Sequence, residues 1–206
     1  NQKLVPGLAK SWKRIDTQTL EFELRDDVKF SNGDAFEAND VKLTHAYITD
    51  PKSKIIYPGR YNWMKEIEVL GPHKIRVHTV QPTGTDLNII AYRFLIWNGK
   101  VLSKLADRAD YGRQLAVGTG PYKVVSVDRN QGIMVERFDG SKLDPKYSPA
   151  PIKRVHGGPL PDRQTQIAQL LTNGIDIVRN VSPDNAVELA KNPSLEISTL
   201  PTASFY

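Results

Sequence analysis

The sequence predicts a fold that mixes α/β and α+β structure. In residues 17–80, apolar and polar side chains alternate along short stretches around one helical pattern, which is typical of an antiparallel sheet with a packed helix. In residues 162–199, two helical patterns alternate with two short apolar runs, which favours an α/β layer. No internal repeat of about 20–50 residues is visible.

Strands are expected across residues 19–30, where apolar side chains alternate with two glutamates, so that one face would be buried and the other wet. Asn32-Gly33 marks the following turn. A helix is predicted from Ala38 to Thr49, with Asp40 in its first turn, where a negative charge suits the helix dipole. Its predicted buried face consists of Val41, Thr44, Tyr47 and Ile48.

The middle of the chain predicts further short elements. A hairpin is expected over residues 65–80, with its turn at Gly71-Pro72. A short helix is expected from Lys100 to Arg108. Two strands follow at residues 122–128 and 132–138, and residues 139–151, which carry three prolines, are predicted to be a loop.

The last third predicts helix, strand, helix and strand in turn. Asp162 caps the first helix and Gly174 is the expected glycine after its C-terminus. Residues 175–178 are predicted to form a short strand. Ser182-Pro183 begins the next helix, which runs to about Lys191, because serine caps a helix and proline suits its first position. A final strand is expected over residues 195–199.

Composition and charge exclude several classes of protein. The chain has 206 residues, no cysteine, and no run of about 18 apolar residues, so it has no disulfide, no cysteine nucleophile and no predicted membrane-spanning helix. Lys and Arg number 28 and Asp and Glu 23, which gives a net charge of +5. The two signs are interspersed, without the basic block typical of nucleic-acid binding, so no nucleic-acid partner is predicted.

No constellation for catalysis or for a cofactor is apparent. The four histidines have no metal-binding spacing, and no serine lies in a G-x-S-x-G pattern. Gly118-Thr119-Gly120-Pro121 is followed by a predicted strand, whereas a phosphate loop requires a helix N-terminus at that place. The sequence therefore predicts no catalytic residue, no metal site and no cofactor.

Two groups of residues resemble one known family. The first is Leu8-Ala9-Lys10-Ser11-Trp12 with Thr19–Arg25, Asn32-Gly33 and Asp40-Val41 after it; the second is Gly118–Lys123 with Gly174–Ile177 and Ser182–Asp184 after it. Their order and spacing resemble those of the family 5 extracellular solute-binding proteins, which are peptide- and nickel-type receptors of bacterial ABC importers.

The resemblance implies a fold and a division into lobes. Residues 1–16 and 118–206 would belong to the first main lobe of a type II periplasmic binding protein, and residues 17–117 to the small extra lobe of the family. Members of the family are much longer, so the chain is expected to be an N-terminal fragment that lacks the C-terminal lobe.

The resemblance also implies a function. A small solute, with a peptide as the expected class, would be captured between two lobes and delivered to the membrane permease of an ABC importer. The protein would be a monomer without enzymatic activity, located in the periplasm or exported to the cell surface. The positions that match cleft-facing residues of the family are Arg179, Asn180, Leu200, Thr202, Tyr57 and Tyr61.

Other functions remain open from the sequence. The same fold could serve as the ligand-sensing domain of a regulator or a chaperone, because fold does not fix function. A hydrolase is a third hypothesis. Within the receptor hypothesis, a peptide, a nickel chelate, an oligosaccharide and an opine are all compatible with these motifs.

Overall fold

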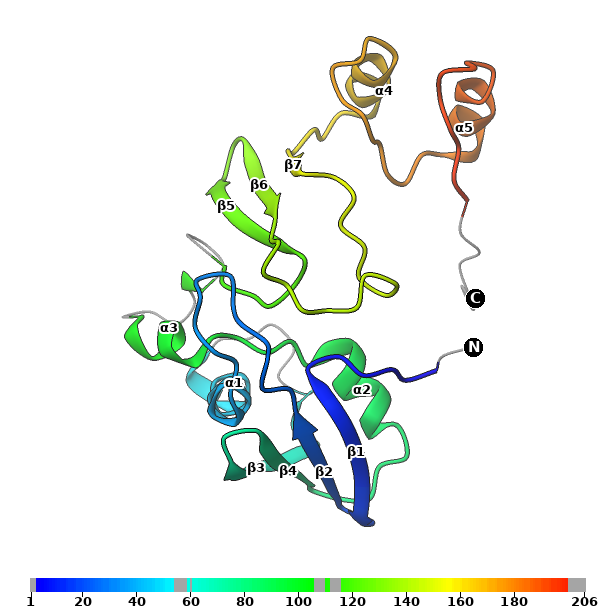
Figure 1. Cartoon of the computed structure of the whole chain (residues 1–206). Coiled ribbons are helices and arrows are strands. Elements are labelled where there is room, and N and C mark those ends of the chain that lie inside the picture. Colours follow the sequence, from blue (N-terminus) through cyan, green and yellow to red (C-terminus); the bar gives the residue numbers. More distant parts are fainter. Residues whose placement is uncertain (1–2, 54–58, 60, 106–109, 112–115, 200–206) are drawn as a thin grey trace. The chain divides into compact units, whose positions relative to one another are not determined.

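Two antiparallel sheets organise the N-terminal part of the chain, and two helices follow them, with no strand beside them in the described residues (Figure 1). The computed structural model describes residues 3–53, 59, 61–105, 110–111 and 116–199. The chain divides into two units, Asn1–Gly158 and Pro159–Tyr206, and each is described by itself. The division into lobes that the family resemblance implies stays a prediction.

The larger sheet has four strands in the order β1-β2-β4-β3, each antiparallel to its neighbours. Its strands are β1 (Ala9–Asp16), β2 (Thr19–Leu24), β3 (Met64–Gly71) and β4 (Lys74–Thr79). The predicted hairpin over residues 65–80 is confirmed as β3 and β4. The predicted strand over residues 19–30 is correct only as far as Leu24, and Lys29 beyond it makes a single isolated bridge with Ala35.

The two faces of this sheet differ in the way that the alternation predicts. Leu20, Phe22 and Leu24 of β2 point into the core together with Ile75 and Val77 of β4, and all five are buried. The opposite face carries charges that the strand register places side by side, since side chains on a strand alternate between the faces. One such row runs across the four strands through Lys13, Glu21, Arg76 and Glu68.

Helix α1 (Ala38–Thr49) begins and ends where the sequence predicts, and it packs against the larger sheet. The four residues of its predicted buried face are all buried. Asp40 lies in the first turn as predicted, and its Oδ2 accepts a hydrogen bond from the backbone N–H of Glu37 at 2.8 Å. The short 3-10 helix η1 (Pro51–Ser53) follows.

Two further helices belong to the first unit. Helix α2 (Asp86–Arg93), which was not predicted, lies beside β1, where Arg14 donates to both carboxylate oxygens of Asp86 at 2.8 and 2.7 Å (Figure 1). Helix α3 (Gly99–Lys104) covers only the first part of the helix predicted from Lys100 to Arg108, and residues 106–109 lie outside the described residues.

The second sheet has the order β5-β6-β7. Strands β5 (Tyr122–Asp128) and β6 (Gly132–Arg137) are the two predicted strands, and residues 139–151 contain no helix or strand, as predicted. Strand β7 (Arg154–Gly157) was not predicted. All four of its residues are exposed, so it has no apolar alternation that could mark it as a strand.

The second unit contains helices α4 (Arg163–Leu171) and α5 (Pro183–Leu189), and their predicted caps are confirmed. The side chain of Asp162 accepts from the N–H of Thr165, and that of Ser182 from the N–H of Asn185. Gly174 is not the left-handed residue after α4; Asn173 is, with a φ of 58°. Gly174 instead donates its N–H to the carbonyl of Gln169 at 2.7 Å and so closes the end of the helix.

The two strands predicted in this unit are wrong. Residues 175–178 and 195–199 have no regular secondary structure. A strand exists only when its backbone is hydrogen-bonded to a neighbour, and neither segment pairs with another strand in the part of the chain that the structure describes. Ile177 is accordingly 70% exposed, although its apolar neighbourhood suggested a buried strand.

Candidate functional site

The segment between α4 and α5 carries two of the predicted binding residues, Arg179 and Asn180. Both are exposed. The backbone of Asn180 is left-handed, with a φ of 57°, a conformation that asparagine tolerates better than most side chains. The chain therefore turns sharply at this residue, shortly before Ser182 caps α5.

A hydrogen-bonded arginine fixes this segment to α4. Nη1 of Arg163 donates to the carbonyl oxygen of Arg179 at 2.9 Å and to Oε1 of Gln166 at 3.1 Å. Nε2 of Gln166 donates in turn to the carbonyl oxygen of Leu160. Sequence reasoning missed Arg163, because no motif links it to a partner 16 residues away. The structure thus brings Arg163 to the backbone of a predicted site residue.

The carboxylate next to Arg163 has a different role. Oδ1 of Asp162 accepts from the N–H of Thr165 at 2.7 Å and from its hydroxyl at 2.6 Å. These two hydrogen bonds, with that of the hydroxyl first, lower the pKa of Asp162 below its ordinary value. Asp162 therefore remains charged at the start of α4, where it serves as the helix cap.

The other predicted site residues have different outcomes. Tyr61 lies in the first unit, is packed against the hydrophobic core, and its hydroxyl donates to the carbonyl oxygen of Arg93 at 3.2 Å. Tyr57, Leu200 and Thr202 lie outside the described residues. Arg179 and Asn180 are neighbours in the sequence, so the structure brings no two separate predicted residues together among those it describes. These contacts test none of the six as a binding residue.

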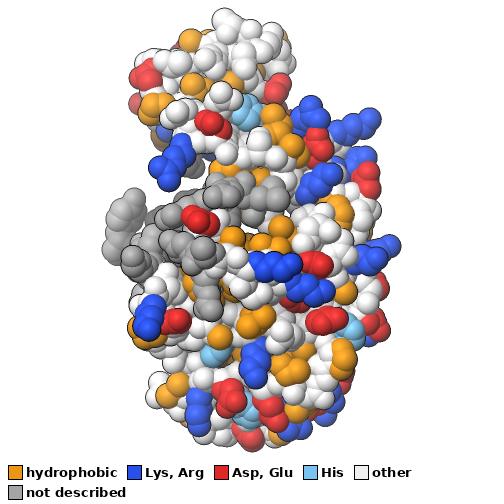
Figure 2. Space-filling model, turned by 90° about the vertical axis from the view of Figure 1, so that its left-hand side faces the viewer, with side chains coloured by type: hydrophobic (Ala, Val, Ile, Leu, Met, Phe, Trp, Pro, Cys, Tyr) orange, Lys and Arg blue, Asp and Glu red, His pale blue; other side chains and the backbone are white. Residues whose placement is uncertain are grey.

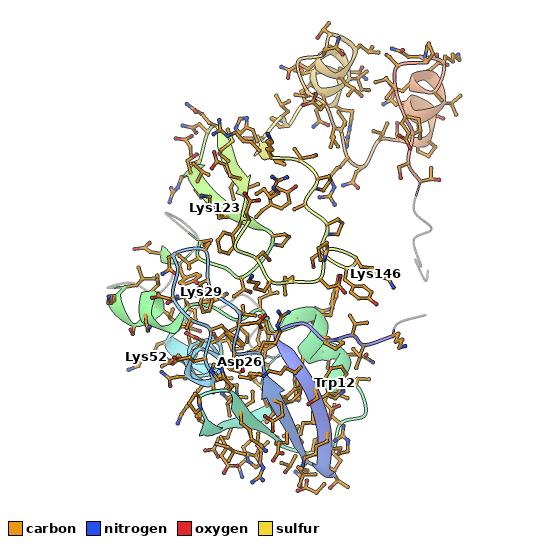
Figure 3. The ribbon with its side chains drawn as sticks, in the orientation of Figure 1. Trp12, Asp26, Lys29, Lys52, Lys123 and Lys146 are labelled. Carbon is orange, nitrogen blue, oxygen red and sulfur yellow. The ribbon has the colours of Figure 1, made fainter. Side chains whose placement is uncertain are left out.

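The first unit contains a large apolar cavity that the sequence did not predict. Its volume is about 880 Å³, which is within the range of about 300–1,000 Å³ that is usual for small-molecule sites. Trp12 of β1, labelled in Figure 3, contributes to the wall. Other contributions come from the core face of the larger sheet, from Leu87 and Ile90 of α2, and from the backbone at Gly118-Thr119-Gly120.

Buried polar contacts stiffen one side of this cavity. The rings of Trp97 and Tyr111 stack with centroids 4.9 Å apart. The Tyr111 hydroxyl donates to the carbonyl oxygen of Val117 at 2.6 Å and accepts from the N–H of Asn98 at 2.9 Å, and burial raises its pKa. Asp40, whose pKa burial also raises, accepts from the N–H of Gly99 at 2.8 Å. These groups are satisfied within the protein and hold α1, α3 and the segment before β5 together.

The histidines that the structure describes make contacts within the protein. His45 is buried against the carbonyl oxygen of Met64 at 3.2 Å, and burial lowers its pKa, while Nε2 of His78 lies 2.9 Å from Glu68. Among the described residues, no group of three or more His, Cys, Asp or Glu side chains could hold a metal ion. No helix within the described ranges has the length and apolar character needed to cross a membrane.

Basic and acidic side chains are interspersed over the face that Figure 2 shows. This agrees with the even spread of charge along the sequence and gives no continuous basic surface on that face.

Comparison with family models decides the assignment. Residues 3–206 match the model described as bacterial extracellular solute-binding proteins, family 5 Middle. The chain belongs to this family. The resemblance seen in the sequence motifs is thereby confirmed over nearly the whole chain.

Several known proteins are similar to this chain in sequence and in structure. The glutathione-binding protein GsiB of Escherichia coli (strain K12) is 27% identical over 213 residues, which cover 97% of this chain. The structure of AgaA from A. tumefaciens R10 in complex with agropinic acid matches with a TM-score of 0.78 at 27% identity, over 93% of this chain and 38% of AgaA. NikZ from Campylobacter jejuni with Ni(L-His) matches with a TM-score of 0.74 at 25% identity, over 85% and 34%.

These matches confirm the fold class. The mixture of helices and sheets is that of type II periplasmic binding proteins, and the chain contains part of that fold. The chain spans about 38% of the length of the curated relatives that it matches.

Proposed function

We propose that this chain is part of the substrate-binding component of a bacterial ABC importer. The component captures a small solute between two lobes and delivers it to a membrane permease. It acts as a monomer without catalysing a reaction, and it works in the periplasm or on the outer face of the cell. The family assignment, whose description is extracellular solute binding, supports the general role.

The class of solute is proposed from the relatives. GsiB is named for glutathione, which is a tripeptide, and the AgaA and NikZ structures contain agropinic acid and a nickel complex of histidine. All three ligands are small molecules with carboxyl groups. We therefore propose a small peptide or an amino-acid derivative with at least one carboxylate.

The observation that carries the site proposal is the segment at Arg179 and Asn180. It presents two exposed polar side chains at a sharp turn that a hydrogen bond from Arg163 holds in place. A rigid backbone with exposed polar groups suits recognition, because little conformational freedom is lost on binding. Tyr57, Tyr61, Leu200 and Thr202 complete the proposed set.

Calorimetric titration of the full-length protein tests this proposal. The probes are glutathione, tri-alanine and histidine with and without Ni²⁺, and the variants are Arg179→Ala and Asn180→Gly. Glycine tolerates the left-handed backbone and removes the whole asparagine side chain, so it separates the side chain from the turn. Each variant should weaken binding by about tenfold to a hundredfold, the size of about 1.5–3 kcal/mol for a hydrogen bond to a charged group.

The matched control is Arg129→Ala, which removes an exposed arginine from the turn between β5 and β6. It should leave the affinity unchanged, and all three variants should keep the melting temperature of the parent. Unchanged affinity in both Arg179→Ala and Asn180→Gly would remove this segment from the site.

A further inference from the structure

Three asparagines of this chain are followed directly by glycine: Asn32, Asn98 and Asn173. In such a pair, the backbone nitrogen of the glycine can attack the side-chain amide of the asparagine, because glycine has no Cβ that hinders the approach. Two groups must be free for this reaction, namely the amide of the asparagine and the N–H of the glycine. The structure holds these groups differently at the three places.

Asn98 is protected by burial and by hydrogen bonds. It is fully buried, its Nδ2 donates to Oδ2 of Asp34 at 2.9 Å, and its Oδ1 accepts from the N–H of Val101 at 2.9 Å. The N–H of Gly99 donates to the carboxylate of Asp40 at 2.8 Å. A reaction at Asn98 therefore requires α3 to separate from α1, an opening that is rare in a folded protein.

Asn32 is exposed, but hydrogen bonds hold its side chain. Nδ2 of Asn32 donates to Oδ2 of Asp34 at 2.7 Å, and Oδ1 of Asn32 accepts from the N–H of Asp34 at 3.1 Å. The N–H of Gly33 donates to the carbonyl oxygen of Phe30 at 2.9 Å. All three hydrogen bonds must break before the amide and the glycine nitrogen can meet.

Asn173 is the least protected of the three. It is exposed just after the end of α4, and its side-chain amide has no hydrogen-bond partner among the described residues. The N–H of Gly174 donates to the carbonyl oxygen of Gln169 at 2.7 Å, which is the one bond described for either reacting group. Helix ends fray easily and residues 171–174 are all exposed, so this bond opens at little cost.

We propose that Asn173 is a site of spontaneous deamidation. The nitrogen of Gly174 forms a bond to Cγ of Asn173, while the amide nitrogen of the side chain leaves as ammonia and takes up the proton of Gly174. Water then opens the resulting succinimide ring at one of its two carbonyl groups, which gives aspartate or isoaspartate. Neither step needs an oxidant or a reductant. Base promotes the first step, because the glycine nitrogen must lose its proton.

The modification would weaken the end of α4. A carboxylate at residue 173 is unfavourable there, because the C-terminal end of a helix carries partial negative charge. In the isoaspartate form, the main chain runs through the former side chain and is one carbon longer, so Gly174 no longer meets Gln169 in the observed geometry. The product therefore changes the path of the chain as it leaves α4.

Incubation of the full-length protein at mildly alkaline pH tests the proposal. Mass spectrometry of samples taken over time measures the conversion of amide to acid, and chromatography separates aspartate from isoaspartate. The conversion at Asn173 should be at least about tenfold faster than at Asn32, where two additional hydrogen bonds must break, and Asn98 should convert slowest. Trypsin places the three pairs in separate peptides, residues 30–42, 94–100 and 164–179.

Two controls separate the effect of the fold from that of the sequence. In concentrated urea the three asparagines should convert at similar rates, because the surroundings that distinguish them are lost. In the folded protein, Gly174→Ala should slow the conversion of Asn173 by at least about tenfold, since the added methyl group hinders the attacking nitrogen. The fold accepts this alanine: Gly174 has no positive φ, and its Cβ would lie 3.4 Å from the carbonyl oxygen of Gln169.

Asn32 or Asn98 converting as fast as Asn173 in the folded protein would overturn the proposal. So would an Asn173 that reacts in urea but stays unconverted in the folded protein. The same ratios of rates in urea as in the folded protein would overturn it too, because the sequence and not the fold would then set the rates. These measurements need no solute, so they are independent of the calorimetric test.

Discussion

Glu21 illustrates how far the surroundings of one residue can shift the pKa of its side chain. Its carboxylate lies 3.2 Å from Lys13, 3.1 Å from Lys74 and 3.0 Å from Arg76, and its side chain is only 4% exposed. Hydrogen bonding from Lys74, which outweighs the opposing effect of burial, together with the bonds from Lys13 and Arg76, lowers its pKa from 4.5 to about 2. The pKa of Lys74 is correspondingly raised, by Glu23 first and then by Glu21.

The substitution Glu21→Gln should make the first unit less stable near neutral pH. Because the pKa of Glu21 is lowered by folding, its stabilising effect is present above the unfolded value of 4.5 and is lost as the pH falls toward about 2. The difference in the free energy of unfolding between parent and variant should therefore narrow as the pH falls through this range. Urea unfolding at a series of pH values measures it.

Glu23→Gln is the matched control, since Glu23 lies on the same strand, is half exposed and, among the described residues, has Lys74 as its one ion-pair partner, at 2.9 Å. At neutral pH, Glu23→Gln should lower the free energy of unfolding by less than Glu21→Gln does. If the difference in the free energy of unfolding between the parent and Glu21→Gln stayed constant from neutral pH to pH 2, the stabilising role of the charged Glu21 would be contradicted.

Sequence alternation could not tell these two glutamates apart. It placed both on the polar face, correctly, but the difference comes from the register of the neighbouring strands. Lys13 and Arg76 stand directly opposite Glu21 on either side, and register depends on chain segments far away in the sequence. The same holds for Arg163, whose contact with Arg179 follows from the path of the chain after α4.

At the scale of elements, predictions succeeded where the signal is local. Helix α1, the β3–β4 hairpin and the caps of α4 and α5 depend on short patterns of apolar residues or on one capping side chain. Strands β1 and β7 were missed because each is an edge strand with many exposed residues. The strands expected at residues 175–178 and 195–199 failed because a strand requires partners that local patterns do not reveal.

Two glycines with positive φ make a test at this scale. Gly132 begins β6 with a φ of 100°, and Gly33 follows Asn32 in the predicted turn with a φ of 91°. A Cβ at Gly33 would meet nothing within 4 Å. A Cβ at Gly132 would overlap the carbonyl oxygen of Gly157 and approach Cα of Gly158 to 2.7 Å.

Gly33→Ala should therefore cost only the backbone strain of a left-handed alanine, about 1–2 kcal/mol. Gly132→Ala should cost about 1–3 kcal/mol more, because it also forces β7 away from β6. Denaturant unfolding of both variants gives the comparison. Equal losses in the free energy of unfolding would show that β7 moves freely enough to accept the methyl group. That result would contradict the pairing of β6 with β7 in the second sheet.

At the scale of the whole molecule, the proposed function depends on what this chain would contribute to a longer receptor. It spans about 38% of the length of the curated relatives, and its proposed binding segment is exposed. Burial of a solute between two lobes supplies most of the free energy of binding in such a mechanism. The 206 residues alone should therefore bind any solute weakly, with a dissociation constant above the micromolar range.

Native mass spectrometry tests the central claim most directly. The full-length protein and the 206-residue chain are each measured as purified and after incubation with the same panel of small carboxylate solutes. The full-length protein should carry the mass of one small molecule, which is lost on denaturation, whereas the 206-residue chain should carry none. A full-length protein that holds no solute under either condition, or a 206-residue chain that holds one as firmly, would contradict the claim.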